Sequence, residues 1–98
     1  HMSINKEQRK KIKALAHHLK VFINIGKEGI NDGVLHSIRD KIEKDELIKI
    51  KFSKNKNEKE FISKKIVKEI QAEKISIIGN ILILYKRSKN PQNRRIKI

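Results

Sequence analysis

Cysteine and tryptophan are absent from the 98-residue sequence, and proline occurs only once. Without cysteine, the chain forms no disulfide bridge and binds no metal through thiolates. No apolar run approaches the ~20 residues of a membrane-spanning helix, and the start of the chain lacks the apolar segment of a signal peptide. We therefore expect a cytoplasmic protein without a membrane partner.

Residues suited to catalysis are also sparse. The acidic residues mostly alternate with lysines along expected helix exteriors. The sequence contains no Ser-His-Asp arrangement, no Cys-His arrangement and no GxxxxGK motif. His17 and His18 are adjacent, so their side chains diverge by about 100° on a helix, and His36 is isolated. We interpret these histidines as solvated or packing residues rather than metal ligands. The sequence predicts no enzyme activity, no cofactor and no small-molecule substrate.

Positive charge is abundant. Lysine and arginine total 25 against 11 acidic residues, which gives a formal net charge of +14. A charge of this size opposes a compact fold through self-repulsion, and a polyanionic partner would relieve it. Nucleic acid is the first candidate and an anionic membrane surface the second. The remaining alternative is a lysine-rich composition without functional meaning.

The first expected helix covers residues 5–20 and is amphipathic. Asn5 and Gln8 have the spacing of a capping box at its start. Its apolar stripe has helical periodicity and consists of Ile12, Leu15, Ala16 and Leu19. The opposite face is basic and consists of Lys6, Arg9, Lys10, Lys13, His17 and Lys20.

The rest of the chain divides into alternating strands and helices. In order, we expect a strand at 21–25, a helix at 31–44 capped by Asn31, a strand at 47–52, a polar loop at 53–57, a helix at 58–71 capped by Asn57, and strands at 74–78 and 81–85. Lys49 and Lys51 alternate with apolar residues and should form a basic solvent face. Gly79 and Asn80 suit a two-residue hairpin turn.

This order, α-β-α-β-α-β-β, predicts a single small α/β domain. Helices between strands imply parallel crossovers, and the final hairpin adds an antiparallel pair, so we expect a four-stranded mixed sheet packed with helices. The strand at 81–85 is apolar on both faces and should lie inside the sheet. His1 and Met2 resemble an expression-tag remnant. Residues 3–88 form the expected domain, and the basic chain should fray from Lys86, leaving 89–98 as a flexible tail.

The GKEG sequence at residues 26–29 follows an expected strand and precedes a helix N-terminus. Free backbone N–H groups there favour an anion, glycines allow close approach of a phosphate backbone, and Lys27 adds positive charge. Gly33 in the next helical turn should keep the approach uncluttered. Glu28 and Asp32 would repel a phosphate. These local features leave a phosphate-binding loop and an ordinary turn equally supported.

Several stretches taken together resemble the CRM (chloroplast RNA splicing and ribosome maturation) domain in its stand-alone bacterial YhbY-type form. They are ALAHHLK, INIGKEGINDGVL, ELIKIKF and ISIIGNILILYKRS, and the resemblance covers residues 4–88. It implies an RNA-binding domain with a KH-like GxxG loop, in which Gly26 and Gly29 are the glycines and Lys27 the basic residue between them. Val21 stands where the family often has proline, and Glu28 makes this loop less basic.

Because stand-alone bacterial members are associated with large-subunit ribosome precursors, the resemblance implies a monomer that binds ribosomal RNA and assists 50S assembly. One alternative is a ribosome-bound translation or stress factor acting on mature subunits. A small nuclease or RNA-modifying enzyme and a DNA-compacting protein are further alternatives. The expected RNA-binding residues are Lys6, Arg9, Lys10, Lys13, His17, Lys20, Gly26, Lys27, Glu28, Gly29, Lys49 and Lys51.

Overall fold

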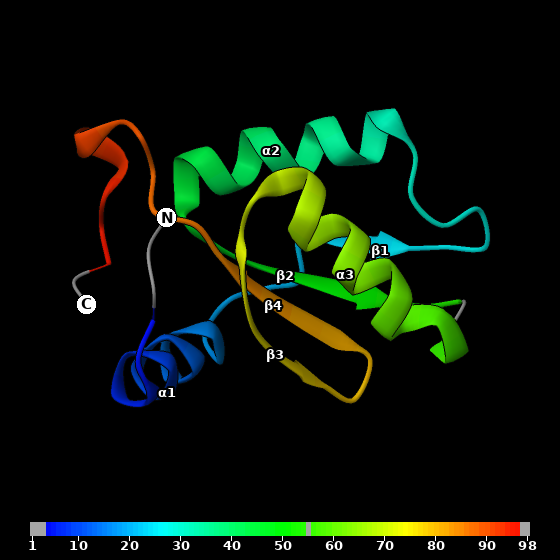
Figure 1. Cartoon of the computed structure of the whole chain (residues 1–98), viewed down its shortest axis with the longest axis horizontal. Coiled ribbons are helices and arrows are strands. Elements are labelled where there is room, and N and C mark those ends of the chain that lie inside the picture. Colours follow the sequence, from blue (N-terminus) through cyan, green and yellow to red (C-terminus); the bar gives the residue numbers. More distant parts are fainter. Residues whose placement is uncertain (1–3, 55, 97–98) are drawn as a thin grey trace.

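The computed structural model describes residues 4–54 and 56–96, and the expected tag remnant at His1 and Met2 lies outside them. Figure 1 shows helices on both faces of one sheet. The elements are α1 (Lys6–Ala16), β1 (Ile23–Ile25), α2 (Asp32–Asp45), β2 (Leu47–Phe52), the short 3-10 helix η1 (Lys56–Glu58), α3 (Lys59–Ile70), β3 (Glu73–Ile78), β4 (Ile81–Tyr85) and the 3-10 helix η2 (Pro91–Asn93). No helix of the described chain is long and apolar enough to cross a membrane.

The four strands form one mixed sheet in the order β1-β2-β4-β3. β1 pairs with β2 in parallel, whereas β4 pairs antiparallel with β2 and with β3. Gly79, with φ 58°, and Asn80 form the turn of the β3–β4 hairpin. The predicted mixed α/β fold, the hairpin and the internal position of β4 are therefore confirmed.

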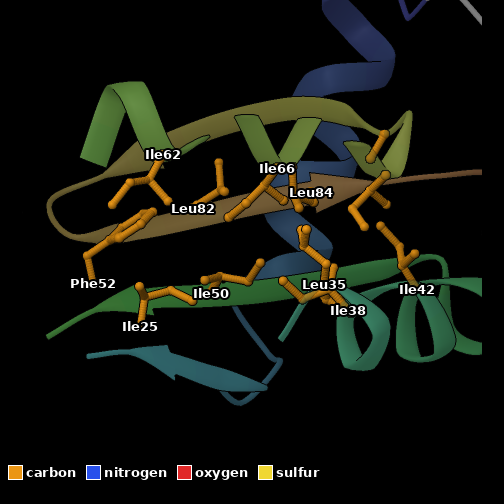
Figure 2. Packing of buried hydrophobic residues seen from close by; sticks show 13 residues of the cluster. Ile25, Leu35, Ile38, Ile42, Ile50, Phe52, Ile62, Ile66, Leu82 and Leu84 are labelled. Atoms are coloured by element: carbon orange, nitrogen blue, oxygen red, sulfur yellow. The ribbon is translucent and has the colours of Figure 1, made fainter. Parts of the chain in front are cut away.

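β4 lies between two apolar clusters. Leu82 and Leu84 face the cluster formed with α2 and α3, which Figure 2 shows around Phe52, Ile62 and Ile66. Its other side contacts α1: Ile83 and Tyr85 pack there with Leu47 and Ile75 of the sheet and with Ile12 and Ala16 of α1. The sheet thus carries α2 and α3 on one face and α1 on the other.

α1 begins as predicted and ends earlier than predicted. Asn5 and Gln8 form the full capping box. The helix ends at Ala16, and the following N–H groups donate to carbonyls three residues back, as His17 does to Ala14 at 3.2 Å and Leu19 to Ala16 at 3.1 Å. These tighter turns redirect the chain toward β2, where the Phe22 N–H donates to the Lys49 carbonyl at 2.9 Å.

The predicted cap of α2 is confirmed, and that of α3 is wrong. Asn31 caps α2, with its side chain accepting from the Val34 N–H at 2.9 Å. Asn57 does not cap α3, because the 3-10 turn at Lys56–Glu58 leads directly into the helix. Glu58 occupies the N-cap position and makes no side-chain capping hydrogen bond.

The segment after β4 does not fray where we expected, because two acidic residues at the end of α2 bind it. Glu46 is fully buried and has a positive φ of 66°. One carboxylate oxygen accepts from the Ser88 N–H at 2.8 Å and the other from the Arg95 N–H at 3.0 Å. No local pattern around Glu46 predicts this buried carboxylate.

Glu43 adds a second attachment point. Its Oε1 accepts from the Ser88 hydroxyl at 2.8 Å and from the Lys89 N–H at 2.7 Å. Burial alone would raise the pKa of Glu43, but these hydrogen bonds, together with those from the Asn90 backbone and the charge of Lys86, hold its pKa below the ordinary value. The carboxylate is therefore stabilised in its charged form while it holds the chain beyond β4.

Arg9 joins α1 to the edge of the sheet. Its Nη1 donates to the carbonyls of Lys74 at 2.6 Å and Ile75 at 2.9 Å. The β3–β4 register shifts between Lys74 and Ser76, so the carbonyls that receive Arg9 lie at an irregularity of the ladder. A guanidinium supplies two donors in the geometry that this site requires.

We predict that Arg9→Ala destabilises the protein by about 1.5 to 3 kcal/mol, because hydrogen bonds from a charged group are lost and two carbonyls lose their donor. Lys10→Ala is the matched control on the next residue of α1; it is exposed and should change the unfolding free energy by under ~0.5 kcal/mol. Urea unfolding of both variants measures the difference. Equal stabilities would show that Arg9 does not anchor α1.

Candidate nucleic-acid interface

The GKEG loop connects the end of β1 to the start of α2 (Figure 1). The Gly29 N–H donates to the Gly26 carbonyl at 3.0 Å, which closes a four-residue turn. Gly29 has φ 71°, a left-handed conformation that side chains disfavour. Glycine at position 29 is therefore required by the turn itself.

Gly26 has no such structural requirement. Its φ lies outside the left-handed region, and a Cβ added there would meet no heavy atom within 4 Å. Neither the conformation nor the packing of the described residues calls for glycine at this position. The open space beside the backbone would admit an external group, and a sugar-phosphate backbone is one group that approaches glycine in this way.

The N-terminus of α2 is already partly occupied by the protein itself. Asn31 Oδ1 accepts from Val34, and a Cβ at position 33 would lie 3.3 Å from that oxygen. Gly33 thus leaves room for the cap, a different role from the one we expected. Glu28 and Asp32 are exposed beside Lys27, so the loop carries charges of both signs.

α1 presents a narrower basic face than the sequence suggested. Arg9 does not lie on the exposed face as predicted, because its guanidinium donates to the β3 carbonyls. Its role in RNA binding stays a prediction. The remaining cations are exposed and, with the following histidine, define the basic α1 face: Lys6, Lys10, Lys13 and His17.

The lysines in and near β2 differ in how exposed they are. Lys49 is half-buried, and its Nζ donates to the Leu19 carbonyl at 3.0 Å, so this lysine secures the chain after α1. Lys20 and Lys51 are exposed. The predicted basic solvent face of β2 is therefore reduced to Lys51, because α1 covers the Leu47 end of that face.

The predicted residues do not form a single cluster. Helix α1 lies below the sheet in the view of Figure 1, whereas the GKEG loop lies beyond the end of β1. Lys51 lies between them in the register of the sheet, because its Cα partner is Asn24, two residues before Gly26.

Phe61, near the start of α3, is exposed, with 71% of its surface accessible. Lys64, Lys65 and Lys68 follow at positions i+3, i+4 and i+7 and are also exposed. In the sequence, these four residues have helical spacing and lie opposite the apolar stripe of α3, a pattern that indicates an exposed helix face.

The histidines show no metal-binding arrangement. His17 and His18 are exposed, and His36 Nε2 lies 3.3 Å from Asp40 Oδ2 in an exposed pair. Within residues 4–54 and 56–96, no group of three or more histidine, cysteine or acidic residues could hold a metal ion.

A family model described as the CRS1 / YhbY (CRM) domain matches residues 4–86. The chain belongs to the CRM domain family. Two CRM relatives are bacterial proteins of similar length. The Bacillus subtilis "Probable RNA-binding protein YqeI" is 32% identical over 93 residues, covering 94% of this chain and 95% of its own. The Haemophilus influenzae "RNA-binding protein" is 35% identical over 88 residues, covering 89% of each chain.

A solved structure shares the CRM fold described above. The solution structure of the hypothetical protein SAV1595 from Staphylococcus aureus superposes with a TM-score of 0.78 at 26% identity, covering 97% of this chain and all of the other. The resemblance proposed from GKEG and its flanking stretches is thus confirmed at the level of family and fold.

The two loop glycines should respond differently to alanine. Gly29→Ala places a side chain in the left-handed region and should cost about 1 to 2 kcal/mol of unfolding free energy. Gly26→Ala meets no steric obstacle and should change stability by under ~0.5 kcal/mol. Thermal or urea unfolding of the two variants provides the comparison. A large loss of stability in Gly26→Ala would mean that the fold, rather than a ligand, requires this glycine.

Proposed function

We propose that this chain is a non-enzymatic RNA-binding protein that binds ribosomal RNA in precursors of the large ribosomal subunit and assists their assembly. The observation that carries the proposal is the open glycine at position 26, which lies in a GxxG turn directly before a helix in a CRM domain. In this proposal the GKEG loop holds an RNA phosphate, and Lys27 supplies a charge-assisted contact.

The net charge of +14 supports a polyanionic partner. RNA phosphates would offset the repulsion among lysines that the fold otherwise bears, and the released counterions would favour association. The basic α1 face and Lys51 supply further exposed cations. They would lie along a phosphate backbone without reading base identity.

Aromatic residues contribute little to this surface. Phe52 and Tyr85 are buried in the two clusters, and the described part of the GKEG loop and basic α1 face contains no aromatic side chain other than the imidazole of His17. Recognition here would therefore depend on phosphate positions and RNA shape more than on base stacking.

The ribosomal part of the proposal rests on the family. The names of the two bacterial relatives describe RNA binding. Stand-alone bacterial CRM proteins are associated with large-subunit precursors, and this chain matches one CRM domain over residues 4–86. We propose accordingly that it acts in the cytoplasm as a monomer.

Lys27 and Glu28 test the phosphate contact by opposite effects. Lys27→Ala should weaken binding to a large-subunit rRNA fragment by about 1 to 3 kcal/mol, because a charge-assisted contact is removed. Glu28→Lys should strengthen binding, because it replaces a repulsive charge beside the same phosphate with an attractive one. Isotherms at one fixed salt concentration give both values.

Lys44→Ala is the matched control for Lys27→Ala. Lys44 is an exposed lysine in the last turn of α2, at the other end of that helix from the loop. Its removal should leave the rRNA affinity nearly unchanged. If Lys27→Ala and Glu28→Lys both bind like the wild type, GKEG is an ordinary turn and the site proposed here is wrong.

A further inference from the structure

A groove opens on the molecule between the end of α3, the start of β3 and the chain that follows β4. Its volume is about 850 Å³. Five of its lining side chains are cationic and one is acidic: Lys68, Lys86, Arg87, Lys89 and Arg94 against Glu73. Such a lining favours an anionic ligand.

Two of the cations build the walls of the groove. Lys86 Nζ donates to the Ile70 carbonyl at 3.0 Å, at the C-terminal end of α3. Arg94 Nε donates to the Ser88 carbonyl at 2.8 Å, within the segment that Glu43 and Glu46 attach to α2. The groove therefore has a defined shape set by hydrogen bonds.

The other three cations face outward. Lys68, Arg87 and Lys89 are exposed, and within the described residues no hydrogen bond or ion pair engages the charged end of any of them. A ligand with several negative charges would meet them without first displacing a protein partner.

The groove continues onto the outer side of α3. Lys68 lines the groove and also belongs to the exposed row Phe61, Lys64, Lys65 and Lys68. The acidic residues of α3 pair with cations outside this row: Glu60 binds Lys74 at 3.2 Å, and Glu69 lies 3.8 Å from Arg39. This row and the groove together are called the α3 surface below.

The α3 surface is separate from the basic α1 face. α3 packs with the cluster on one face of the sheet, and α1 packs with the cluster on the other. Figure 1 shows α3 and α1 on opposite sides of β3 and β4. A ligand on the α3 surface would therefore not occupy the basic α1 face.

Phe61 favours RNA over an acidic protein as this ligand. Among the described residues of α3, Phe61 is the one large apolar side chain that is exposed, at 71%. The other large apolar side chains that are exposed lie in or just after α1 and in β3. A protein interface requires a packed group of apolar residues at its centre. A single exposed aromatic ring among lysines is sufficient to stack with one unpaired base.

We propose that the α3 surface is a second RNA-binding surface, on which an unpaired base stacks against Phe61 and the RNA backbone follows the α3 lysines into the groove. This inference rests on the proposed function, because it assigns a second segment of the same class of ligand. The domain would then contact RNA on both sides of its sheet and hold two RNA segments at a fixed separation.

A single introduced tryptophan tests the stacking. The natural sequence has none, so Phe61→Trp creates a unique fluorophore at the proposed contact, and Ser37→Trp creates one at an exposed position of α2 as the matched control. A large-subunit rRNA fragment with unpaired bases should quench the tryptophan at position 61 and leave that at position 37 unchanged. Phe61→Ala should weaken binding of this fragment by about 5- to 150-fold.

Salt dependence tests the groove independently. Lys68 and Lys44 are both exposed lysines in the last turn of a helix. Lys68→Ala should lower the slope of log affinity against log salt by about 0.7 to 0.9, the value of one phosphate contact, whereas Lys44→Ala should preserve it.

The outcomes separate this inference from the proposed function. Suppose that the wild type binds RNA and that Lys27→Ala weakens this binding. If RNA then fails to quench the tryptophan at position 61, and Lys68→Ala keeps the full salt slope of the affinity, the second surface is overturned and the proposed function stands. If the wild type binds no RNA, both fail. Quenching by a polyglutamate peptide and not by RNA would overturn the inference in favour of an acidic protein partner.

Discussion

Burial of β4 on both faces is the interaction on which the rest of the structure depends. Leu82 and Leu84 join the cluster under α2 and α3, and Ile83 and Tyr85 join the cluster under α1. Each fully buried side chain of this size contributes about 1.5 to 3 kcal/mol relative to its exposed state. The strand therefore holds all three helices to one sheet, against the repulsion of a chain with net charge +14.

The acidic residues reinforce this arrangement, and two of them bind N–H groups and a hydroxyl rather than a lysine. Glu43 and Glu46 bind the chain after β4, Glu60 and Glu69 connect α3 to its neighbours, and Asp45 pairs with Lys41 at 2.8 Å. Because so many carboxylates are used within the fold, exposed cations of α1, β2 and α3 remain available to an outside polyanion.

Local signals in the sequence were sufficient for most elements of the fold. The capping box at Asn5, the cap at Asn31 and the Gly79-Asn80 turn act within a few residues, and the structure confirms each of them. Arg9 and Lys49 were wrongly predicted to face solvent, because the carbonyls to which they donate hydrogen bonds lie 65 and 30 residues away in the sequence. The attachment of Ser88 to Glu46 spans 42 residues and has no periodic signature either. The hydrogen-bond partners of these charged residues are therefore visible only in the tertiary structure.

Sedimentation tests the central claim, that the chain binds large-subunit precursors through their RNA. Lysates of cells that make the tagged full chain would be separated on a sucrose gradient, with the Lys27→Ala variant as a parallel sample. The account predicts that the wild type sediments with particles lighter than the mature large subunit, that ribonuclease releases it, and that the variant is depleted from these fractions. Sedimentation with mature 70S ribosomes would contradict an assembly role, and a position at the top of the gradient would contradict ribosomal RNA binding altogether.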